Sequence, residues 1–206
     1  VALFDMSHLP SWFQLIIFFV ALDFVQWIIH NLLHRVPFLW NFHKVHHSVE
    51  EMGFAAHLRF HWMETILYKS AMYIPLAMIG FGLEDFFIVH IFTTAIGHLN
   101  HANLRITYGP LKYIFNNPIM HLWHHVKVLP KDRPYGVNYG ITLSVWDYLF
   151  GTAYIPNENE NEPLGFDHIE EFPKTFWQQI YRAHVNDLDG GAIFPDMADY
   201  RTIRAK

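Results

Sequence analysis

Histidine is the residue type whose number and spacing in this 206-residue chain point most directly to chemistry. The chain holds 16 histidines and no cysteine. Four groups of histidines have spacings of three or four residues: His30-Asn-Leu-Leu-His34, His43-Lys-Val-His46-His47, His98-Leu-Asn-His101 and His121-Leu-Trp-His124-His125. Residues three or four apart share one face of a helix, so the imidazoles of each group can converge on a metal ion.

Together, the four groups predict a site with two metal ions. Imidazole suits zinc, copper, iron and nickel. One pair at helical spacing often arises by chance, whereas two HxxHH groups with two further pairs are far stronger evidence. Ten ligands are too many for one ion, which takes about four to six, but would suit two ions about 3.5–4 Å apart or slightly farther. The alternative is a set of polar histidines that only satisfy hydrogen bonds at an interface.

The carboxylates that accompany other metal sites are absent from these groups. Zinc hydrolases usually carry a carboxylate base in HExxH, and soluble di-iron bundles use Glu-x-x-His motifs; the sequence has neither. A dinuclear site ligated by histidine alone therefore needs another precedent. In the last group, Asn117 is suited to cap the helix and Pro118 to occupy its first turn.

The composition indicates a chain in contact with lipid. Hydrophobic residues make up 52%, aromatic residues 17% and charged residues 16%, against roughly 25% charged residues in ordinary soluble domains. The formal net charge of −5 argues against a nucleic-acid partner. Without cysteine, disulfides, thiolate zinc sites, iron–sulfur clusters and a cysteine nucleophile are excluded.

Three apolar stretches predict membrane helices. Trp12–Ile29 is long enough to cross a bilayer. Met63–Leu83 and Phe86–Leu99 meet at the turn Gly82-Leu83-Glu84-Asp85, which predicts an antiparallel hairpin that dips into the bilayer and returns. Pro37 is expected to open a short helix that runs to His47. The chain begins at Val1 without a signal-peptide pattern, so whether a further span precedes it stays open.

The hairpin places all the histidine groups on one face of the membrane. Eight basic residues lie on that face, which makes it cytoplasmic by the positive-inside rule: Arg35, Lys44, Arg59, Arg105, Lys112, Lys127, Lys131 and Arg133. We therefore expect an all-α, multi-pass integral membrane helical bundle with a cytosolic helical cap that carries the histidines. The bacterial inner membrane and the endoplasmic reticulum are both open. Residues 1–155 would form this domain, and residues 156–206 a polar linker, a surface helix over Phe172–Val185 and a tail.

One face of the first span is polar. Asp23, Gln26, His30 and His34 follow at spacings of three, four and four residues. A carboxylate inside a span is costly and usually functional, and metal-ligating histidines commonly donate their second N–H to a carboxylate. We expect Asp23 to orient His30 in this way. A polar stripe that only helps helices pack is the alternative.

The ordered series HxxxH, HxxHH, HxxH and HxxHH resembles the fatty acid hydroxylase and sterol desaturase superfamily. The likeness covers most of the chain, from about Asp23 to Thr152, and Trp62 stands where the family commonly has proline. Further matching elements are Leu58-Arg59-Phe60-His61-Trp62-Met63-Glu64, Asn103 after His101, Asn117-Pro118, Asn138-Tyr139-Gly140 and Trp146-Asp147-Tyr148-Leu149-Phe150-Gly151-Thr152.

The resemblance implies a membrane di-iron oxygenase that uses O2 to hydroxylate or desaturate a lipid, such as a sterol or fatty acyl chain. It implies iron rather than zinc, although zinc can substitute in imidazole sites. It also implies a separate cytochrome- or ferredoxin-type electron donor with an NAD(P)H reductase. The ligands it implies are His30, His34, His43, His46, His47, His101, His121, His124 and His125, with His98 as a tenth at a position where family members vary.

Four other polar residues are expected near the site. Arg59, His61 and Glu64 would form a network that steadies the site or shapes the substrate entrance, or else would anchor the chain at the membrane interface. His90 would hydrogen-bond a neighbouring helix or line a lipid tunnel. The competing function is a histidine-rich metal transporter or metal-binding membrane protein, whose histidines would be expected along the spans.

Overall fold

The computed structural model describes residues 3, 8–156 and 163–182. Over this part the chain is helical, without strands beyond two isolated bridges, which confirms the all-α prediction for the described residues. Its seven α-helices are α1 Ser11–Arg35, α2 Pro37–His47, α3 Trp62–Ile79, α4 Leu83–His101, α5 Pro118–His124, α6 Val145–Leu149 and α7 Phe176–Arg182. Three 3-10 helices are η1 Phe54–Leu58, η2 Gly109–Tyr113 and η3 Ile169–Glu171.

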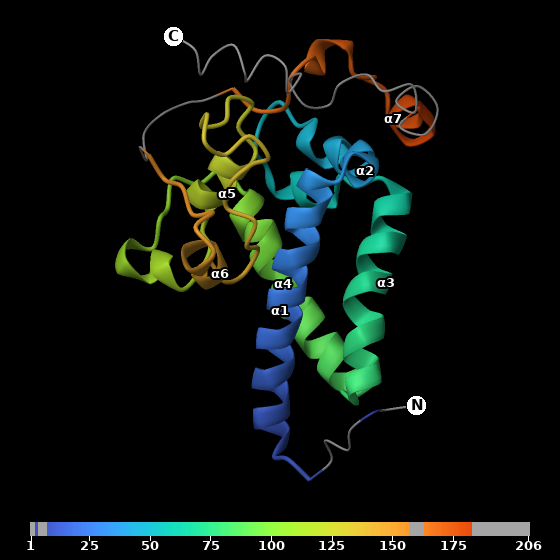
Figure 1. Ribbon diagram of the computed structural model, residues 1–206, viewed down its shortest axis with the longest axis vertical. Coiled ribbons are helices and arrows are strands. Elements are labelled where there is room, and N and C mark those ends of the chain that lie inside the picture. The colour runs from blue at the N-terminus through green and yellow to red at the C-terminus, as the bar shows by residue number, and fades with distance from the viewer. Residues whose placement is uncertain (1–2, 4–7, 157–162, 183–206) are drawn as a thin grey trace.

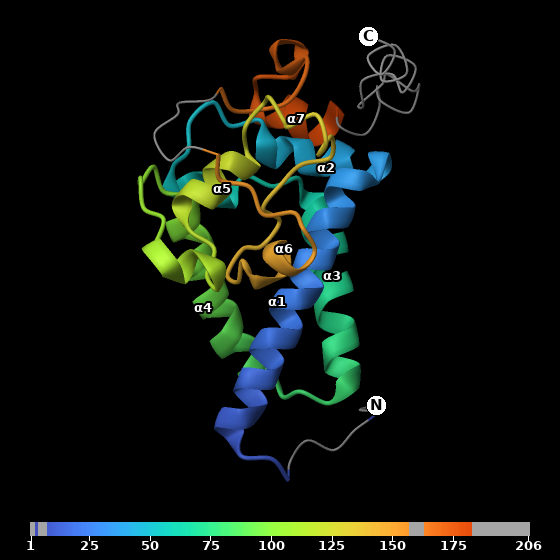
Figure 2. The ribbon, with the colours of Figure 1, turned by 60° about the vertical axis from the view of Figure 1, so that its left-hand side comes forward.

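The three long helices α1, α3 and α4 form a shaft, and the short helices α2, α5 and α7 lie at one end of it (Figures 1 and 2). The shaft is held by an apolar core of buried side chains from all three helices and from the turn between α3 and α4. Its members are Phe18, Leu22, Met72, Leu76, Phe81 and Val89. Close packing of these side chains fixes how the three helices enter the histidine-bearing end.

Helix α1 runs farther than the apolar stretch that predicted it. It contains neither glycine nor proline, and it ends at Arg35 because Pro37 disfavours a helical conformation at Val36. The extension carries His30 and His34 beyond the apolar run. Among the described residues, α1 is the one helix long and apolar enough to cross a membrane by length and composition. Pro37 occupies the first turn of α2, as predicted.

Helices α3 and α4 form the predicted antiparallel hairpin (Figure 1). Gly80 ends α3 in a left-handed conformation with φ of 115°, which glycine adopts without strain. The predicted turn is wrong in one respect, since Glu84 and Asp85 belong to the first turn of α4. The Asp85 carboxylate accepts a hydrogen bond from the Gly82 N–H at 3.1 Å, which starts the helix earlier than expected.

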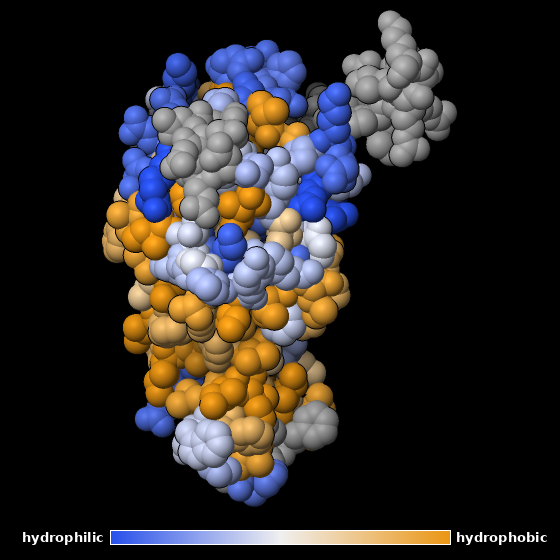
Figure 3. Space-filling view, turned by 90° about the vertical axis from the view of Figure 1, so that its left-hand side faces the viewer, coloured by the Kyte–Doolittle hydropathy of each residue, from blue (hydrophilic) through white to orange (hydrophobic). Residues whose placement is uncertain are grey.

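Apolar side chains cover the outside of the shaft, whereas hydrophilic side chains gather at the end that carries the histidines (Figure 3). Exposed members on α1, α3 and α4 include Trp12, Ile16, Ile66, Ile74, Met78, Leu83, Phe87, Ile88, Ile91 and Phe92. A surface of this kind is far more apolar than monomeric soluble proteins tolerate.

The surface helix predicted over Phe172–Val185 is shorter in the structure. It is α7, which starts at Phe176 after Pro173, and its Phe176 and Trp177 side chains are exposed. Residues 183–185, the acidic linker at 157–162 and the tail from 187 lie outside the described residues. The division into two domains stays a prediction.

Candidate metal centre

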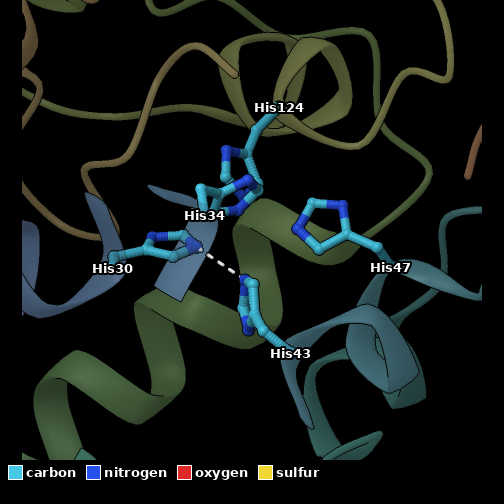
Figure 4. Close-up of side chains that lie close together, drawn as sticks. All are labelled: His30, His34, His43, His47 and His124. Atoms are coloured by element: carbon cyan, nitrogen blue, oxygen red, sulfur yellow. Dashed lines mark hydrogen bonds between the residues drawn. The ribbon is translucent and has the colours of Figure 1, made fainter. Parts of the chain in front are cut away.

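Five histidines from three helices converge near the junction of α1 and α2 (Figure 4). Their ring nitrogens lie within 4.8 Å of one another, and every ring is buried. Helix α1 provides His30 and His34, α2 provides His43 and His47, and α5 provides His124. We call this set the five-histidine group.

A second set of four buried histidines lies directly beside the first, and we call it the four-histidine group. It consists of His46, His101, His121 and His125, again with ring nitrogens within 4.8 Å of one another. The Nε2 atoms of His46 and His101 lie 3.1 Å apart, and those of His101 and His121 lie 2.9 Å apart.

Helices α2 and α5 contribute to both groups. On α2, His43 and His47 face the five-histidine group while His46 faces the four-histidine group. The rings of His47 and His125, one from each group, stack with centroids 4.3 Å apart. The two groups are therefore adjacent rather than separate sites.

The donor atoms fit a pair of metal ions. The Nε2 atoms of His34, His47 and His124 are buried without a hydrogen-bond partner. Orphaned buried polar atoms cost free energy, and several of them aimed at one point are what an ion with imidazole ligands would satisfy. Burial, reinforced by neighbouring imidazoles, holds the pKa of His47 well below its ordinary value of 6.5, so this ring is neutral and able to bind a metal at pH 7.

Backbone carbonyls and one carboxylate hold the outer nitrogens of these rings. The Nδ1 atom of His30 lies 2.7 Å from the Tyr139 carbonyl oxygen, and that of His124 lies 2.8 Å from the Val137 carbonyl oxygen. The remaining such contacts join His43 to Glu64 Oε1 at 2.7 Å, His101 to the Gly97 carbonyl at 2.7 Å and His46 to the Arg59 carbonyl at 3.2 Å. An Nδ1–H that donates outward leaves Nε2 as the inward-facing lone pair.

Asp147 organises the loop that supports His30 and His124. Its buried carboxylate accepts hydrogen bonds from the backbone N–H groups of Tyr139 and Gly140, both at 2.8 Å. It also accepts from the Thr152 hydroxyl at 2.6 Å and from the Trp27 indole at 3.0 Å. The sequence motif at residues 146–152 contains Asp147 but predicts no role for it. An acid within an aromatic-rich segment is the feature of the sequence that could have indicated a buried, hydrogen-bonded carboxylate.

The expectation that Asp23 orients His30 is wrong. The Asp23 carboxylate accepts a hydrogen bond from the Trp146 indole at 2.8 Å and lies 3.4 Å from the Leu143 nitrogen. Residues seven positions apart on a helix are separated by about 10.5 Å along its axis, which is too far for a contact. Asp23 instead joins α1 to the segment around α6.

Glu64 and Arg59 contact the histidine-bearing helix α2, in line with the expected steadying network. Glu64 holds His43, and the Arg59 guanidinium donates to the Val45 carbonyl and the Ser48 hydroxyl, both at 3.1 Å. His61 caps α3, with its ring accepting from the Met63 N–H at 3.1 Å, so a tryptophan at the next position does not prevent the helix from starting.

The other expected site residues lie farther out. The Tyr73 hydroxyl and His90 Nδ1 are 2.6 Å apart, so His90 bonds a neighbouring helix, and it also lines a cavity described below. His98 lies outside both groups, with its Nδ1 2.9 Å from the Phe54 carbonyl oxygen and its ring stacked on Phe54. Asn103 is exposed after the end of α4.

The buried rings predict a loss of stability in acid for the metal-free protein. Burial and neighbouring histidines lower the pKa of His47, His121 and His125 well below 6.5, so the folded chain excludes protons that the unfolded chain binds. The free energy of unfolding should be highest above about pH 7. Below pH 6.5, the ordinary pKa of histidine, it should fall by up to about 1.4 kcal/mol per pH unit for each such ring. Thermal unfolding at about pH 5.5 and 7.5 measures this, and equal Tm values would contradict it. A His168→Ala variant, which alters an exposed ring, should keep the same pH dependence.

The described residues thus gather nine buried histidines into two adjacent groups, a candidate metal centre in which every ligand would be a histidine. The family model for fatty acid hydroxylase matches residues 15–152. This chain belongs to the fatty acid hydroxylase family, as the sequence motifs predicted.

Among curated relatives, the ornithine lipid hydroxylase OlsE of Rhizobium tropici is 36% identical over 156 residues, 76% of this chain and 46% of that protein. The alkylglycerol monooxygenase of Xenopus tropicalis is 32% identical over 172 residues, 79% of this chain and 35% of that protein. The human alkylglycerol monooxygenase is 30% identical over 175 residues, 77% of this chain and 37% of that protein. The chain thus spans less than half the length of these relatives. Their names are those of oxidoreductases. No solved structure matches the chain.

Proposed function

We propose that this chain is the core of a membrane lipid hydroxylase whose centre holds two iron ions. The observation that carries the proposal is the pair of adjacent histidine groups, five and four buried rings with no carboxylate among them. The relatives named as lipid hydroxylase and alkylglycerol monooxygenase support hydroxylation rather than desaturation. The ten histidines of the sequence motifs would provide nine ligands, with His98 left out.

Iron bound here would supply the activation of O2. In the net reaction one oxygen atom enters a C–H bond of the lipid and the other leaves as water, which consumes two electrons and two protons. The electrons would come from a cytochrome- or ferredoxin-type donor with an NAD(P)H reductase, as the family resemblance implies.

The protein's own residues would hold the ligands and shape the space beside them. Glu64 fixes His43, and the Tyr139 and Val137 carbonyls fix His30 and His124. Rings held in this way would keep their Nε2 atoms aimed at the bound metal ions. The rings also lie in a buried interior that excludes water from the reaction.

The membrane arrangement is part of the proposal. Helix α1 would cross the bilayer, and the α3–α4 hairpin would dip into it with its exposed apolar side chains facing lipid. The histidine-bearing end would then lie on the cytoplasmic side, where an electron donor has access. A lipid substrate would reach the centre from within the bilayer.

The test is the metal content and activity of the purified protein in mild detergent. We expect about two iron ions per chain and O2-dependent hydroxylation of an added lipid when a reduced ferredoxin or cytochrome is supplied. Metal well below one ion per chain after iron reconstitution, together with metal uptake when the protein is placed in vesicles, would contradict the proposal and favour a transporter.

A further inference from the structure

A cavity of about 260 Å³ lies between α1, α3 and α4, next to both histidine groups. His30, His43, His46 and His101 line it where it meets the candidate metal centre. Lys69, Met72, His90 and Thr94 line it farther along α3 and α4. Its size is near the lower limit of ligand pockets, about 300 Å³, so it would accept one end of a lipid rather than a whole two-chain lipid.

Lys69 is the one lysine among the residues that line this cavity, and no arginine lines it. It is partly buried on α3, and within the described part of the chain it forms neither an ion pair nor a hydrogen bond. Its Nζ atom lies 5.4 Å from the centroid of the Tyr73 ring and 6.0 Å from that of Tyr68. Tyr73 is itself tied to His90 across the hairpin.

The acid closest in sequence does not neutralise Lys69. Glu64 also lines the cavity, but its Oε1 atom is engaged by His43 at 2.7 Å, and its buried Oε2 atom has no hydrogen-bond partner, Lys69 included. Glu64 precedes Lys69 by five residues, or about 7.5 Å along the helix axis. A lysine in the wall of an apolar shaft is costly unless it meets an anion, and such residues commonly mark substrate sites.

We propose that Lys69 binds an anionic oxygen group, a carboxylate or a phosphate, on the lipid that occupies this cavity. The proposal rests on the proposed function, because it takes the cavity beside the histidines as the substrate site. The Thr94 hydroxyl, which lines the same cavity from α4, is a second donor for the anion. With the anion held by Lys69 on α3 and Thr94 on α4, a carbon farther along the lipid would lie at the end of the cavity that His30, His43, His46 and His101 line.

Binding can be measured without turnover, by competition against a diazirine-bearing palmitic acid that is photo-crosslinked to the full chain in neutral detergent. Oleate and oleyl alcohol compete as an anionic and a neutral lipid with the same chain. We expect oleate to compete about 10-fold better, a difference of about 1.4 kcal/mol. Oleoyl lysophosphatidate against monoolein repeats the comparison for phosphate and shows which anion is preferred.

Three variants decide whether Lys69 causes the preference. Lys69→Met should reduce the ratio to about one, Lys69→Arg should largely keep it, and Lys131→Met, which alters an exposed lysine, should match the wild type. An unchanged ratio in Lys69→Met, or a wild-type ratio of one for both pairs, would overturn the proposal. If the wild type still bound iron and hydroxylated lipid, the proposed function would stand; loss of those properties in the wild type would count against the function instead.

Discussion

Replacing His124 with alanine should empty the five-histidine group of its metal. His124 is buried, its Nε2 has no partner within the protein, and it faces His30, His34 and His47 from a different helix. His124 is the one member of the five-histidine group that α5 provides, so its replacement removes the contribution of that helix. We expect the iron content to fall from about two ions per chain to about one or fewer, and hydroxylation to fall at least about 100-fold. Metal analysis and product formation measure the two effects.

His98→Ala is the matched control for that experiment. His98 belongs to the same kind of sequence motif but stacks on Phe54 outside both groups. It should keep about two iron ions and most of the activity. Circular dichroism of both variants tests whether the helices are retained. Full iron content in His124→Ala, or loss of iron in His98→Ala with the helices intact, would contradict the assignment of the groups.

Replacing Asp147 with alanine should destabilise the protein more than any substitution on its surface. The change leaves four donors without their acceptor, two of them backbone N–H groups in the loop that supports His30 and His124. Removing one partner from a buried network of this kind costs about 3–5 kcal/mol, which lowers the Tm by about 10 °C. Iron affinity should fall as well, by about 10- to 100-fold, because the carbonyls of Tyr139 and Val137 lose their fixed positions.

Two further variants separate the network from the negative charge. Asp147→Asn keeps the size and one acceptor oxygen, so its Tm should lie between those of the wild type and Asp147→Ala. Asp132→Ala removes an exposed carboxylate paired with Arg133 at 3.7 Å, and it should change the stability by no more than about 1 kcal/mol. A Tm for Asp147→Ala equal to that of Asp132→Ala would show that the loop does not depend on this acid.

The stability of the loop also depends on close approach of backbone to backbone. A Cβ added at Gly140 would collide with the Leu143 carbonyl oxygen and would lie 2.9 Å from the Asp147 carboxylate. The Asn-Tyr-Gly motif that sequence comparison singled out therefore has a structural reason: its glycine admits the turn, and its Tyr139 carbonyl reaches His30.

Much of the fold follows from local features of the sequence. Pro37 opens α2, Asn117 accepts a hydrogen bond from the Met120 N–H at 3.0 Å to cap α5, and Pro118 fills the first turn of α5. The hairpin of α3 and α4 follows from two apolar stretches and the glycines between them. These features depend on contacts within a few residues, which the sequence displays directly.

The histidine spacing by itself predicted that the rings within each of the four groups, ten in all, would share a helix face, because residues three and four apart lie on one side of a helix. Only the tertiary structure decided which rings meet. Spacing alone does not separate His46 from His43 and His47, because that division depends on which helix lies on each side of α2. The tertiary structure also leaves His98 outside both groups, where its ring stacks on Phe54. The contacts of Glu64 with His43 and of Asp147 with Trp27 likewise join distant segments, and such contacts are set by packing rather than by local order along the chain.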